Sequence, residues 1–257
     1  MGILNVTPDS FSDGNLYFSL EAAVKRAVEL EREGADIIDI GGESTRPNAA
    51  AVGLAEELDR VVPVIEALAG RISVPISVDT YKAGVARAAC AAGAEIVNDV
   101  SGLCFDPAMA AVVAEADAGL VVQHTRGTPD RMQSQTQYDD LMAEVKNYLS
   151  DSLAKAARAG VKACRIAVDP GIGFGKSAEG NLELIRRLAE LLPLGHPILV
   201  GPSRKSFIRT VLGEGDNARL FGTAAAVAVC VVHGASIVRV HDVAAMRDVA
   251  VMARALA

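Results

Sequence analysis

The chain has 257 residues, of which 51% are hydrophobic and 22% are charged. This composition excludes a disordered or low-complexity protein, and the length fits one large domain or two small ones. The formal net charge of −7 argues against nucleic acid or an anionic membrane as the main partner. An anionic small-molecule substrate is compatible with this charge only if its site is locally cationic.

Eight short segments rich in valine and isoleucine recur along the chain and are predicted to be strands. They are Gly2–Val6, Asp36–Ile40, Pro75–Val78, Glu95–Val97, Gly119–Val122, Arg165–Val168, Pro197–Val200 and Ser236–Val240. Each is followed by a stretch with helical periodicity, for example Leu20–Glu33, Glu56–Ala69, Ala83–Ala92, Asp139–Ala159, Asn181–Leu191 and Ala244–Leu256. Continuous apolar strands that alternate with helices predict a parallel sheet covered on both faces.

The spacing of these units favours a barrel. Between Asn5 and Val240 the predicted strands recur about every 34 residues, which is the size of one βα unit. The alternative is a doubly wound open sheet, but the segment after the first strand lacks that fold's glycine-rich phosphate motif. No linker divides the chain. We therefore predict one α/β domain over residues 1–257, a (β/α)₈ TIM barrel with its active site at the C-terminal ends of the strands.

Polar residues follow every predicted strand. They are Asn5, residues 41–46, Asp79 and Thr80, Asn98 and Asp99, Gln123 and His124, residues 169–171, residues 201–205, and residues 239–242. Helix capping can explain Asp106, Ser177 and Asp242. It does not explain the cations, because positive charge is unfavourable at helix N-termini. Four such residues, Arg46, Lys205, Arg239 and His241, predict a bound anion.

The C-terminal ends of the predicted strands, which form one rim of the barrel, also carry oxygen acceptors. Asp79 and Asp169 lie there beside Asn98, with Asp99 as a third candidate carboxylate. Such acceptors suit a heterocycle with several N–H donors, because each buried N–H needs a partner. Glycoside hydrolysis by paired acids fits the cationic half of the rim poorly. A divalent metal site is a further alternative, but no carboxylates cluster along the chain.

The glycine-rich segment from Asp169 to Ser177 ends like a P-loop, but Pro170 occupies the position of the required first glycine. We expect its glycines to allow close approach of the backbone to a flat ligand. Phe174 could pack within the loop or stack on that ligand. Residues 7–18 form either a mobile lid or an ordinary surface loop, and His196 and His233 are interpreted as structural.

Cysteine usage and the absence of targeting signals predict a cytoplasmic protein. Cys90, Cys104, Cys164 and Cys230 lie far apart, without a histidine at metal-ligand spacing, and are interpreted as reduced thiols. The first residues lack a basic leader, and no apolar run is long enough to span a bilayer without a charge or glycine break.

Together these segments closely resemble the dihydropteroate synthase family. The matching strings are MGILNVTPDSFSDG at 1–14, DIIDIGGESTRP at 36–47, ISVDT at 76–80, IVNDVSG at 96–102, DPGIGFGK at 169–176, GPSRKSF at 201–207 and RVHDV at 239–243. The resemblance implies a barrel enzyme that joins 6-hydroxymethyl-7,8-dihydropterin pyrophosphate to p-aminobenzoate in folate synthesis. Its products are 7,8-dihydropteroate and pyrophosphate. It also implies Mg²⁺, a homodimer and inhibition by sulfonamides.

The resemblance also implies roles for individual residues. Pterin pyrophosphate is expected to contact Thr45, Asp79, Asn98, Asp169, Lys205, Arg239 and His241, of which the last three are the expected catalytic residues. The p-aminobenzoate site is expected to include Arg46, Phe174 and Ser203, and Asn5 is expected to bind Mg²⁺. The substrate's own amine is the nucleophile, so no nucleophilic side chain is required.

Two other functions share features with this reading. The pterin domain of a corrinoid-dependent methyltransferase should lack the TPDSFSDG string and the Ser203-Arg204-Lys205 site, and both are present. A non-catalytic pterin-binding paralogue is expected to have lost a substrate residue, and none of the residues above is missing. Thr125 and Arg126 depart from the family pattern, and Arg126 is left without an assigned role.

Overall fold

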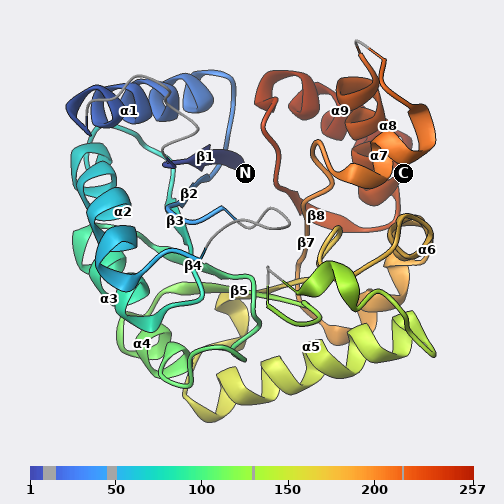
Figure 1. Ribbon diagram of the computed structural model, residues 1–257, viewed down its shortest axis with the longest axis horizontal. Helices are drawn as coiled ribbons and strands as arrows, with labels where there is room; N and C mark the ends of the chain where they lie inside the picture. The colour runs from blue at the N-terminus through green and yellow to red at the C-terminus, as the bar shows by residue number, and fades with distance from the viewer. Residues whose placement is uncertain (8–15, 45–50, 129–130, 216) are drawn as a thin grey trace.

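The computed structural model describes residues 1–7, 16–44, 51–128, 131–215 and 217–257, and a curled sheet of eight parallel strands forms its centre (Figure 1). The strands are β1 (Gly2–Asn5), β2 (Ile38–Gly41), β3 (Ile76–Asp79), β4 (Ile96–Asp99), β5 (Gly119–Gln123), β6 (Ile166–Asp169), β7 (Ile198–Val200) and β8 (Ala235–Val238). Each strand pairs with the next one in sequence. All eight predicted strands are confirmed, and their ends differ from the prediction by at most two residues.

The first and last strands of this order also meet. The Val240 N–H donates to Met1 O at 3.0 Å, and the Ile3 N–H donates to Val240 O at 3.0 Å. Gly2 and Val240 form a parallel bridge. These contacts bring residues just after β8 beside β1.

Helices surround the outside of the curled sheet (Figure 1). They are α1 (Leu16–Arg32), α2 (Leu54–Leu68), α3 (Ala83–Ala92), α4 (Met109–Glu115), α5 (Leu141–Arg158), α6 (Ala178–Arg186), α7 (Ser206–Leu212), α8 (Ala218–Val232) and α9 (Val243–Leu256), with 3₁₀ turns η2 (Met132–Ser134), η3 (Ala163–Arg165) and η4 (Leu188–Leu194). The predicted helix Asn181–Leu191 is wrong in one respect, because α6 ends at Arg186 and η4 follows. Leu184 in α6 and Leu188 and Leu191 in η4 are all fully buried, so the apolar pattern of the sequence does not reveal where α6 ends.

Two apolar layers and one polar layer make up the interior. The large core lies between the outer face of the sheet and the helices. Inside the curl, a small core of Met1, Val121, Ala167 and Leu199 fills the space. Asp39, Asp79 and Asn98 are buried polar residues on β2 to β4. The polar layer is therefore concentrated toward the carboxyl ends of these strands.

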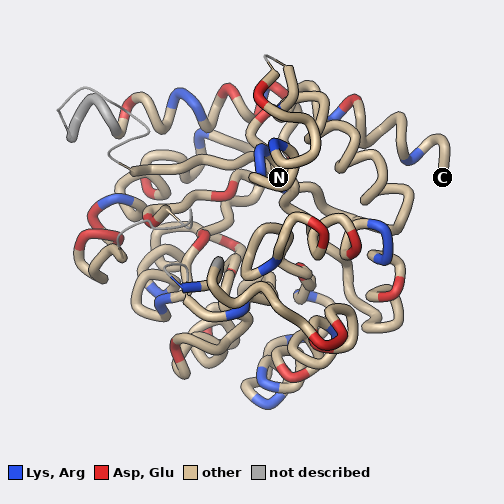
Figure 2. Tube along the Cα trace, turned by 45° about the vertical axis from the view of Figure 1, so that its right-hand side comes forward, with Lys and Arg blue, Asp and Glu red and all other residues tan. Residues whose placement is uncertain are grey.

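Both signs of charge are interspersed over the outer helices (Figure 2). Several are paired, such as Lys146 with Glu190 at 2.8 Å and Arg165 with Asp117 at 2.9 Å. The net charge of the chain is thus an average over a mixed surface. Within the described ranges, no helix is both long enough and apolar enough to cross a membrane.

Close packing of α7 on α8 depends on Gly222. A Cβ at this position would lie 2.2 Å from Ile208 Cγ2 and 3.0 Å from Leu212 Cδ1. Gly222→Ala is therefore expected to destabilise the protein by about 1–3 kcal/mol in urea unfolding. Gly180→Ala on α6 is the control, because its Cβ would meet nothing closer than 3.4 Å. It should be neutral or stabilising by up to about 1 kcal/mol. Equal stability of both variants would contradict this packing.

Candidate active site

A polar cavity lies at the carboxyl ends of the strands. Its lining residues are Asp79, Asn98, Val100, Gln123, Asp169, Ile172, Phe174, Gly201, Lys205 and Arg239. They come from β3, β4, β5 and β6 and from the segments after β4, β6, β7 and β8. Six of the predicted site residues are thus brought together. Two larger depressions, below the amino ends of the strands and between α6, α7 and α8, have mainly apolar walls.

A buried ion-pair network lies at the base of this cavity. Arg239 Nε lies 2.6 Å from Asp39 Oδ2, and Arg239 Nη2 lies 2.6 Å from Asp79 Oδ2. Asp39 is fully buried and Asp79 is 8% exposed. Removing one member of such a network leaves an uncompensated buried charge, which costs about 3–5 kcal/mol. Arg239, which directly follows β8, therefore links the end of that strand to β2 and β3.

Asp39 is a site residue that the sequence interpretation missed. It lies in the middle of β2, whereas the candidate residues were sought at strand ends. Two signals could have found it. First, a carboxylate within an apolar strand is rarely buried without a partner, so Asp39 by itself predicts a buried ion pair. Second, residues two positions apart on a strand lie on the same face, so Asp39 shares a face of β2 with Gly41 at the strand end.

The orientation of the Asn98 amide follows from its neighbour. Asn98 Nδ2 donates to Asp39 Oδ2 at 3.1 Å, which directs Oδ1 elsewhere. Among the described residues, Asn98 Oδ1 is a buried oxygen without a hydrogen-bond partner. A buried acceptor of this kind is costly when unpaired. It therefore offers an acceptor to an N–H group of a ligand.

Two carboxyl groups in the cavity have raised pKa values. Burial raises the pKa of Asp79 to about 7, and the neighbouring Arg239 opposes this rise. Burial also raises the pKa of Asp169 to about 6, against the N–H of Gly171, which donates to Asp169 Oδ1 at 2.7 Å. Near neutral pH both groups can change protonation state, which is common in binding and catalytic sites.

Lys205 and Phe174 form one wall. Lys205 Nζ lies 4.3 Å from the centroid of the Phe174 ring, which is a cation–π contact. Burial and Arg239 lower the pKa of Lys205 to about 8, so the amine is mostly protonated at neutral pH. Phe174 also packs on Val100 and Met132. Its ring therefore serves loop packing and lines the cavity as well.

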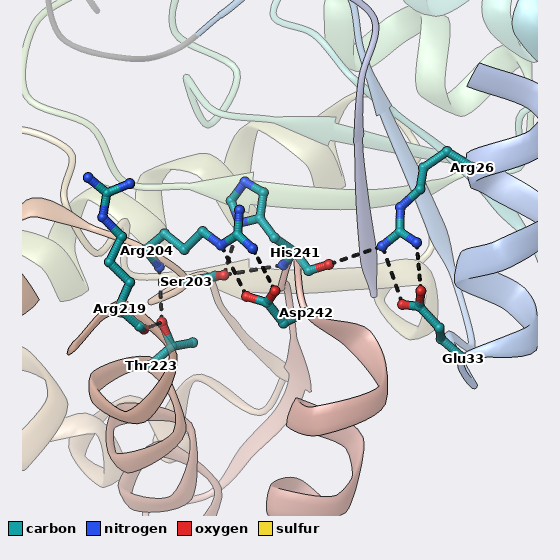
Figure 3. A network of polar contacts seen from close by, with 8 residues as sticks. All are labelled: Arg26, Glu33, Ser203, Arg204, Arg219, Thr223, His241 and Asp242. Atoms are coloured by element: carbon teal, nitrogen blue, oxygen red, sulfur yellow. Dashed lines mark hydrogen bonds and ion pairs between the residues drawn. The ribbon is translucent and has the colours of Figure 1, made fainter. Parts of the chain in front are cut away.

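Ser203 and His241 bind each other across two loops (Figure 3). Ser203 Oγ accepts the His241 backbone N–H at 3.2 Å and lies 2.9 Å from His241 Nδ1. The hydroxyl is thus free to donate to Nδ1, which places the imidazole proton on Nε2. Burial, together with Arg204 and Arg239, lowers the pKa of His241 to about 4. His241 is neutral near pH 7, so the prediction that it adds a positive charge was wrong.

The Ser203–His241 pair belongs to a larger network of polar contacts (Figure 3). Arg204 Nη2 lies 2.6 Å from Asp242 Oδ1, and Arg26 donates to His241 O at 3.5 Å. The Asp242 side chain makes no capping hydrogen bond to α9 because its carboxylate pairs with Arg204. The predicted capping role of Asp242 is thus wrong. That of Ser177 is confirmed by the hydrogen bond from the Gly180 N–H. Asp106 accepts the N–H of Ala83, the first residue of the preceding helix α3, and the N–H of Ala108 before α4, so it is not the N-cap of the helix that follows it.

Asp99 does not face the cavity. Its carboxylate accepts the Ser101 N–H and the Leu103 N–H, each at 2.8 Å, and the Ser101 hydroxyl at 2.7 Å. Asp99 therefore orders the turn after β4, which corrects its assignment as a third acid of the rim. Asp39 supplies the third carboxylate instead.

The remaining candidate residues, apart from Asn5, divide into three groups. Thr45 and Arg46 lie outside the described residues. Arg126 has a structural setting, because it packs 4.3 Å from the Tyr138 ring centroid and pairs with Glu144 at 3.3 Å. His196 and His233 approach backbone carbonyls of Ile166 and Ile185, away from the cavity. Both are structural, as predicted.

Comparison with known proteins identifies the family. A model described as pterin binding enzyme matches residues 1–241. A dihydropteroate synthase from Synechocystis is 50% identical over 257 residues, which span 100% of this chain and 89% of that protein. The chain belongs to the dihydropteroate synthase family. It is accordingly an enzyme, of the transferase class.

Solved dihydropteroate synthases share this arrangement of eight parallel strands and helices. The Clostridium difficile enzyme, crystallised in the presence of pteroic acid, has a TM-score of 0.94 and 47% identity, covering 100% of this chain and 95% of that one. The Xanthomonas albilineans enzyme with 4-aminobenzoic acid has a TM-score of 0.92 and 46% identity, covering 100% and 92%. The resemblance seen in the sequence is therefore confirmed at the level of family and overall fold.

The raised pKa of Asp169 makes stability depend on pH. Its ordinary pKa is 3.8, and the folded protein raises it to about 6. Between these values the folded state binds more protons than the unfolded state, so stability falls as pH rises. Asp169→Asn mimics the protonated acid. It should match the parent near pH 4 and exceed it by about 2–3 kcal/mol above pH 7, as measured by urea unfolding.

Asp36→Asn is the matched control, because this carboxylate is exposed and lies before β2, at the opposite end of the sheet. The control should keep the parent's pH dependence. If Asp169→Asn also keeps it, Asp169 does not retain its proton in the folded state.

Proposed function

We propose that the protein catalyses the reaction of its family, joining 6-hydroxymethyl-7,8-dihydropterin pyrophosphate to p-aminobenzoate to give 7,8-dihydropteroate and pyrophosphate. The observation that carries this proposal is the convergence of buried acceptors and cations in one cavity. Asp79, Asn98 and Asp169 offer oxygen acceptors, while Lys205 supplies an ammonium donor. Related structures bind pteroic acid and 4-aminobenzoic acid. These ligands support the same substrate classes here.

We infer that the curled sheet is a closed (β/α)₈ barrel and one domain. The hydrogen bonds that Val240 makes with Met1, just before β1, and with Ile3 in β1 support closure. In such a barrel the loops after the strands carry the chemistry. The position of the polar cavity at the carboxyl ends supports an active site there.

The pterin ring is proposed to lie between Asp79, Asn98 and Asp169. The unpaired Asn98 Oδ1 supports an N–H contact. Asp79 and Asp169 can accept from pterin N–H groups when ionised and donate to ring nitrogens when protonated. Arg239, held by Asp39 and Asp79, would then contribute its flat guanidinium to the wall of the pterin site.

The pyrophosphate group is proposed to leave toward His241 and Asn5. Neutral His241 can donate through Nε2–H, and Arg239 and Lys205 supply positive charge as the C–O bond breaks. The electron pair of that bond leaves with pyrophosphate. The amine of p-aminobenzoate then bonds to the pterin methylene carbon and loses a proton, so no protein nucleophile is needed.

Mg²⁺ is proposed to bind with pyrophosphate, and its charge would stabilise the leaving group. A Cβ on Gly41 would lie 3.8 Å from Asn5 Oδ1 and 3.7 Å from Asp79 Oδ2, so both oxygens face the space beside Gly41. Within the described part of the chain, no group of three His, Cys, Asp or Glu side chains could hold a metal. Asn5 Oδ1 and Asp79 Oδ2 fit Mg²⁺, because this ion typically uses few protein ligands along with water and phosphate oxygens.

The p-aminobenzoate site is proposed to lie beside Ser203 and Phe174, with Arg46 as a further contact. Ser203 is 4% exposed, and only Arg204 and Lys205 separate it from the start of α7 at Ser206. The Phe174 ring offers an apolar surface to the benzene ring of this substrate. Lys205 Nζ lies over the Phe174 ring, between the two proposed substrate sites.

The alternatives are less well supported. A non-catalytic paralogue should have lost part of the polar cavity, yet six candidate residues line it. A corrinoid-dependent methyltransferase pterin domain should lack the Ser203-Arg204-Lys205 site, which is present in this chain. Neither alternative is favoured by an observation of its own.

We further propose that the protein acts in the cytoplasm as a homodimer. All four cysteines are free thiols, which supports a reducing compartment. The faces of α7 and α8 expose large apolar side chains, namely Val211, Leu212, Phe221, Val229 and Val232. Exposed apolar side chains gathered on neighbouring helices are typical of protein–protein interfaces.

Catalysis is tested by measuring pyrophosphate release. Folded protein with both substrates and Mg²⁺ should release pyrophosphate, and omission of any one component should stop it.

Lys205→Met should lower kcat/KM by about 10²-fold or more, because a buried cation beside the reacting groups is lost. Lys162→Met is the control, since Lys162 is exposed and pairs with Asp117. No release by the folded parent protein would refute the enzymatic proposal, whereas a fully active Lys205→Met would remove only Lys205 from the site.

The dimer is tested by light scattering after gel filtration. Phe221→Glu places a charge on the α8 face, where Phe221 is 63% exposed, and should give a monomer. Leu54→Glu on α2, where Leu54 is 48% exposed and does not lie on α7 or α8, should leave the dimer intact. A parent protein that is monomeric at micromolar concentration would exclude the proposed assembly.

A further inference from the structure

Lys176 is a buried lysine that the reaction above does not use. It ends the glycine-rich segment 169–176 and is 3% exposed. Its Nζ lies 2.9 Å from His124 Nδ1, 2.9 Å from Gly171 O and 3.0 Å from Phe174 O. An ammonium group has three N–H donors, so each donor has one acceptor. Among the described residues, no carboxylate lies within ion-pair distance of it, which is unusual for a buried lysine.

His124 is suited to accept from this ammonium. Burial and the charge of Lys176 lower the pKa of His124 to about 2, so the imidazole stays neutral. With Nδ1 as acceptor, the ring proton resides on Nε2. The ring is fixed by Tyr148, whose ring centroid lies 4.8 Å away in an edge-on contact. The acceptor therefore belongs to a rigid part of the protein.

The backbone of the segment curls around the ammonium. Gly171 has a φ of +71°, and a Cβ there would lie 1.9 Å from His124 O. The segment is also held from outside, by Tyr138, which donates to Gly175 O at 2.8 Å, and by Asn181, which accepts the Gly173 N–H at 2.6 Å. The carbonyl oxygens of Gly171 and Phe174 thus both point toward the Lys176 ammonium.

The same segment carries parts of the proposed pterin site. Asp169 begins it, and the Phe174 ring lies under Lys205 Nζ. A Cβ on Gly173 would lie 2.9 Å from Lys205 Cδ, so the stem of Lys205 rests directly on this backbone. Lys176 does not itself line the cavity. Its contact with Phe174 O nevertheless fixes the residue whose ring supports Lys205.

We propose that Lys176 is a positioning residue, whose ammonium, bound by His124 Nδ1, Gly171 O and Phe174 O, holds segment 169–176 in the shape that aligns Asp169 and Lys205 on the pterin substrate. The proposal rests on the proposed function, because the aligned groups are the pterin contacts inferred there. It adds a residue that contacts neither substrate.

The charge of Lys176 gives the proposal a second consequence. Burial lowers the pKa of Lys176 to about 7, so the side chain is mostly an ammonium at the lower pH of the acid limb. The charged or titratable groups that face it are His124 and Arg126 after β5, Asp169 at the end of β6, and Lys205 after β7. Its positive charge lowers the pKa of Asp169. Loss of this charge should raise the pKa of Asp169 and move the acid limb of the kcat/KM profile to higher pH. A purely structural role would not move that limb.

The test compares two pairs of variants. Lys176→Met keeps the length of the side chain but removes its charge and all three donors, and Lys162→Met is the exposed control. His124→Leu removes the acceptor, whereas His124→Asn can keep an oxygen near the position of Nδ1. Circular dichroism establishes folding, and kcat, KM for each substrate and amide hydrogen exchange of residues 169–176 are then measured.

Lys176→Met is expected to fold, to lose about 10–100-fold in kcat/KM for pterin pyrophosphate, and to exchange faster in segment 169–176. KM for p-aminobenzoate should change less. His124→Leu should behave similarly, His124→Asn should recover most of the loss, and Lys162→Met should match the parent. The acid limb should move to higher pH only in Lys176→Met.

Two results would overturn the proposal. One is a folded Lys176→Met with parental kcat/KM and parental exchange in the segment. The other is a loss of activity that follows only the folded fraction, with an unmoved acid limb. Failure of the proposed function is distinguishable, because the parent protein would then form no dihydropteroate. In that case exchange and calorimetric binding of pterin pyrophosphate still decide whether Lys176 orders a pterin site.

Discussion

The arrangement of the cavity depends on one buried guanidinium. Arg239 reaches from the end of β8 to Asp39 on β2 and Asp79 on β3, so one side chain joins strands that are far apart in sequence. Because a buried charge is tolerated only with its partners in place, these strands must stay in register. Asn98 is oriented in turn by Asp39, and its Oδ1 has no hydrogen-bond partner among the described residues. Ligand recognition and the integrity of the sheet therefore share the same contacts.

Much of the fold follows from local sequence signals. Valine- and isoleucine-rich runs locate all eight strands, and the rule that strand ends meet at one rim brings Asp79, Asn98, Asp169 and Lys205 together. The error at Asp99 has a simple cause. Neighbouring residues of a strand point to opposite faces, so Asn98 and Asp99 cannot both enter the cavity. The same rule places Asp39 inside, but only once the inward face of β2 is known.

Other features cannot be read from the sequence. The neutral state of His241 depends on burial and on Arg204 and Arg239, which reach it through the fold. The surroundings of Lys176 depend on two carbonyl orientations and on a histidine 52 residues away. A sequence motif shows that a lysine follows the glycines, but not that its ammonium is enclosed. Long-range electrostatics and backbone direction set these properties, and neither has a local signature.

The crowding at Gly171 has a consequence for the evolution of this cavity. A side chain there would overlap the His124 carbonyl, and the positive φ disfavours any residue other than glycine. Single substitutions can alter the side chains that line the cavity, but they cannot easily reshape this stretch of backbone. The glycine at 171 therefore limits the shapes that segment 169–176 can adopt, and with them the positions that Asp169 and Lys205 can take.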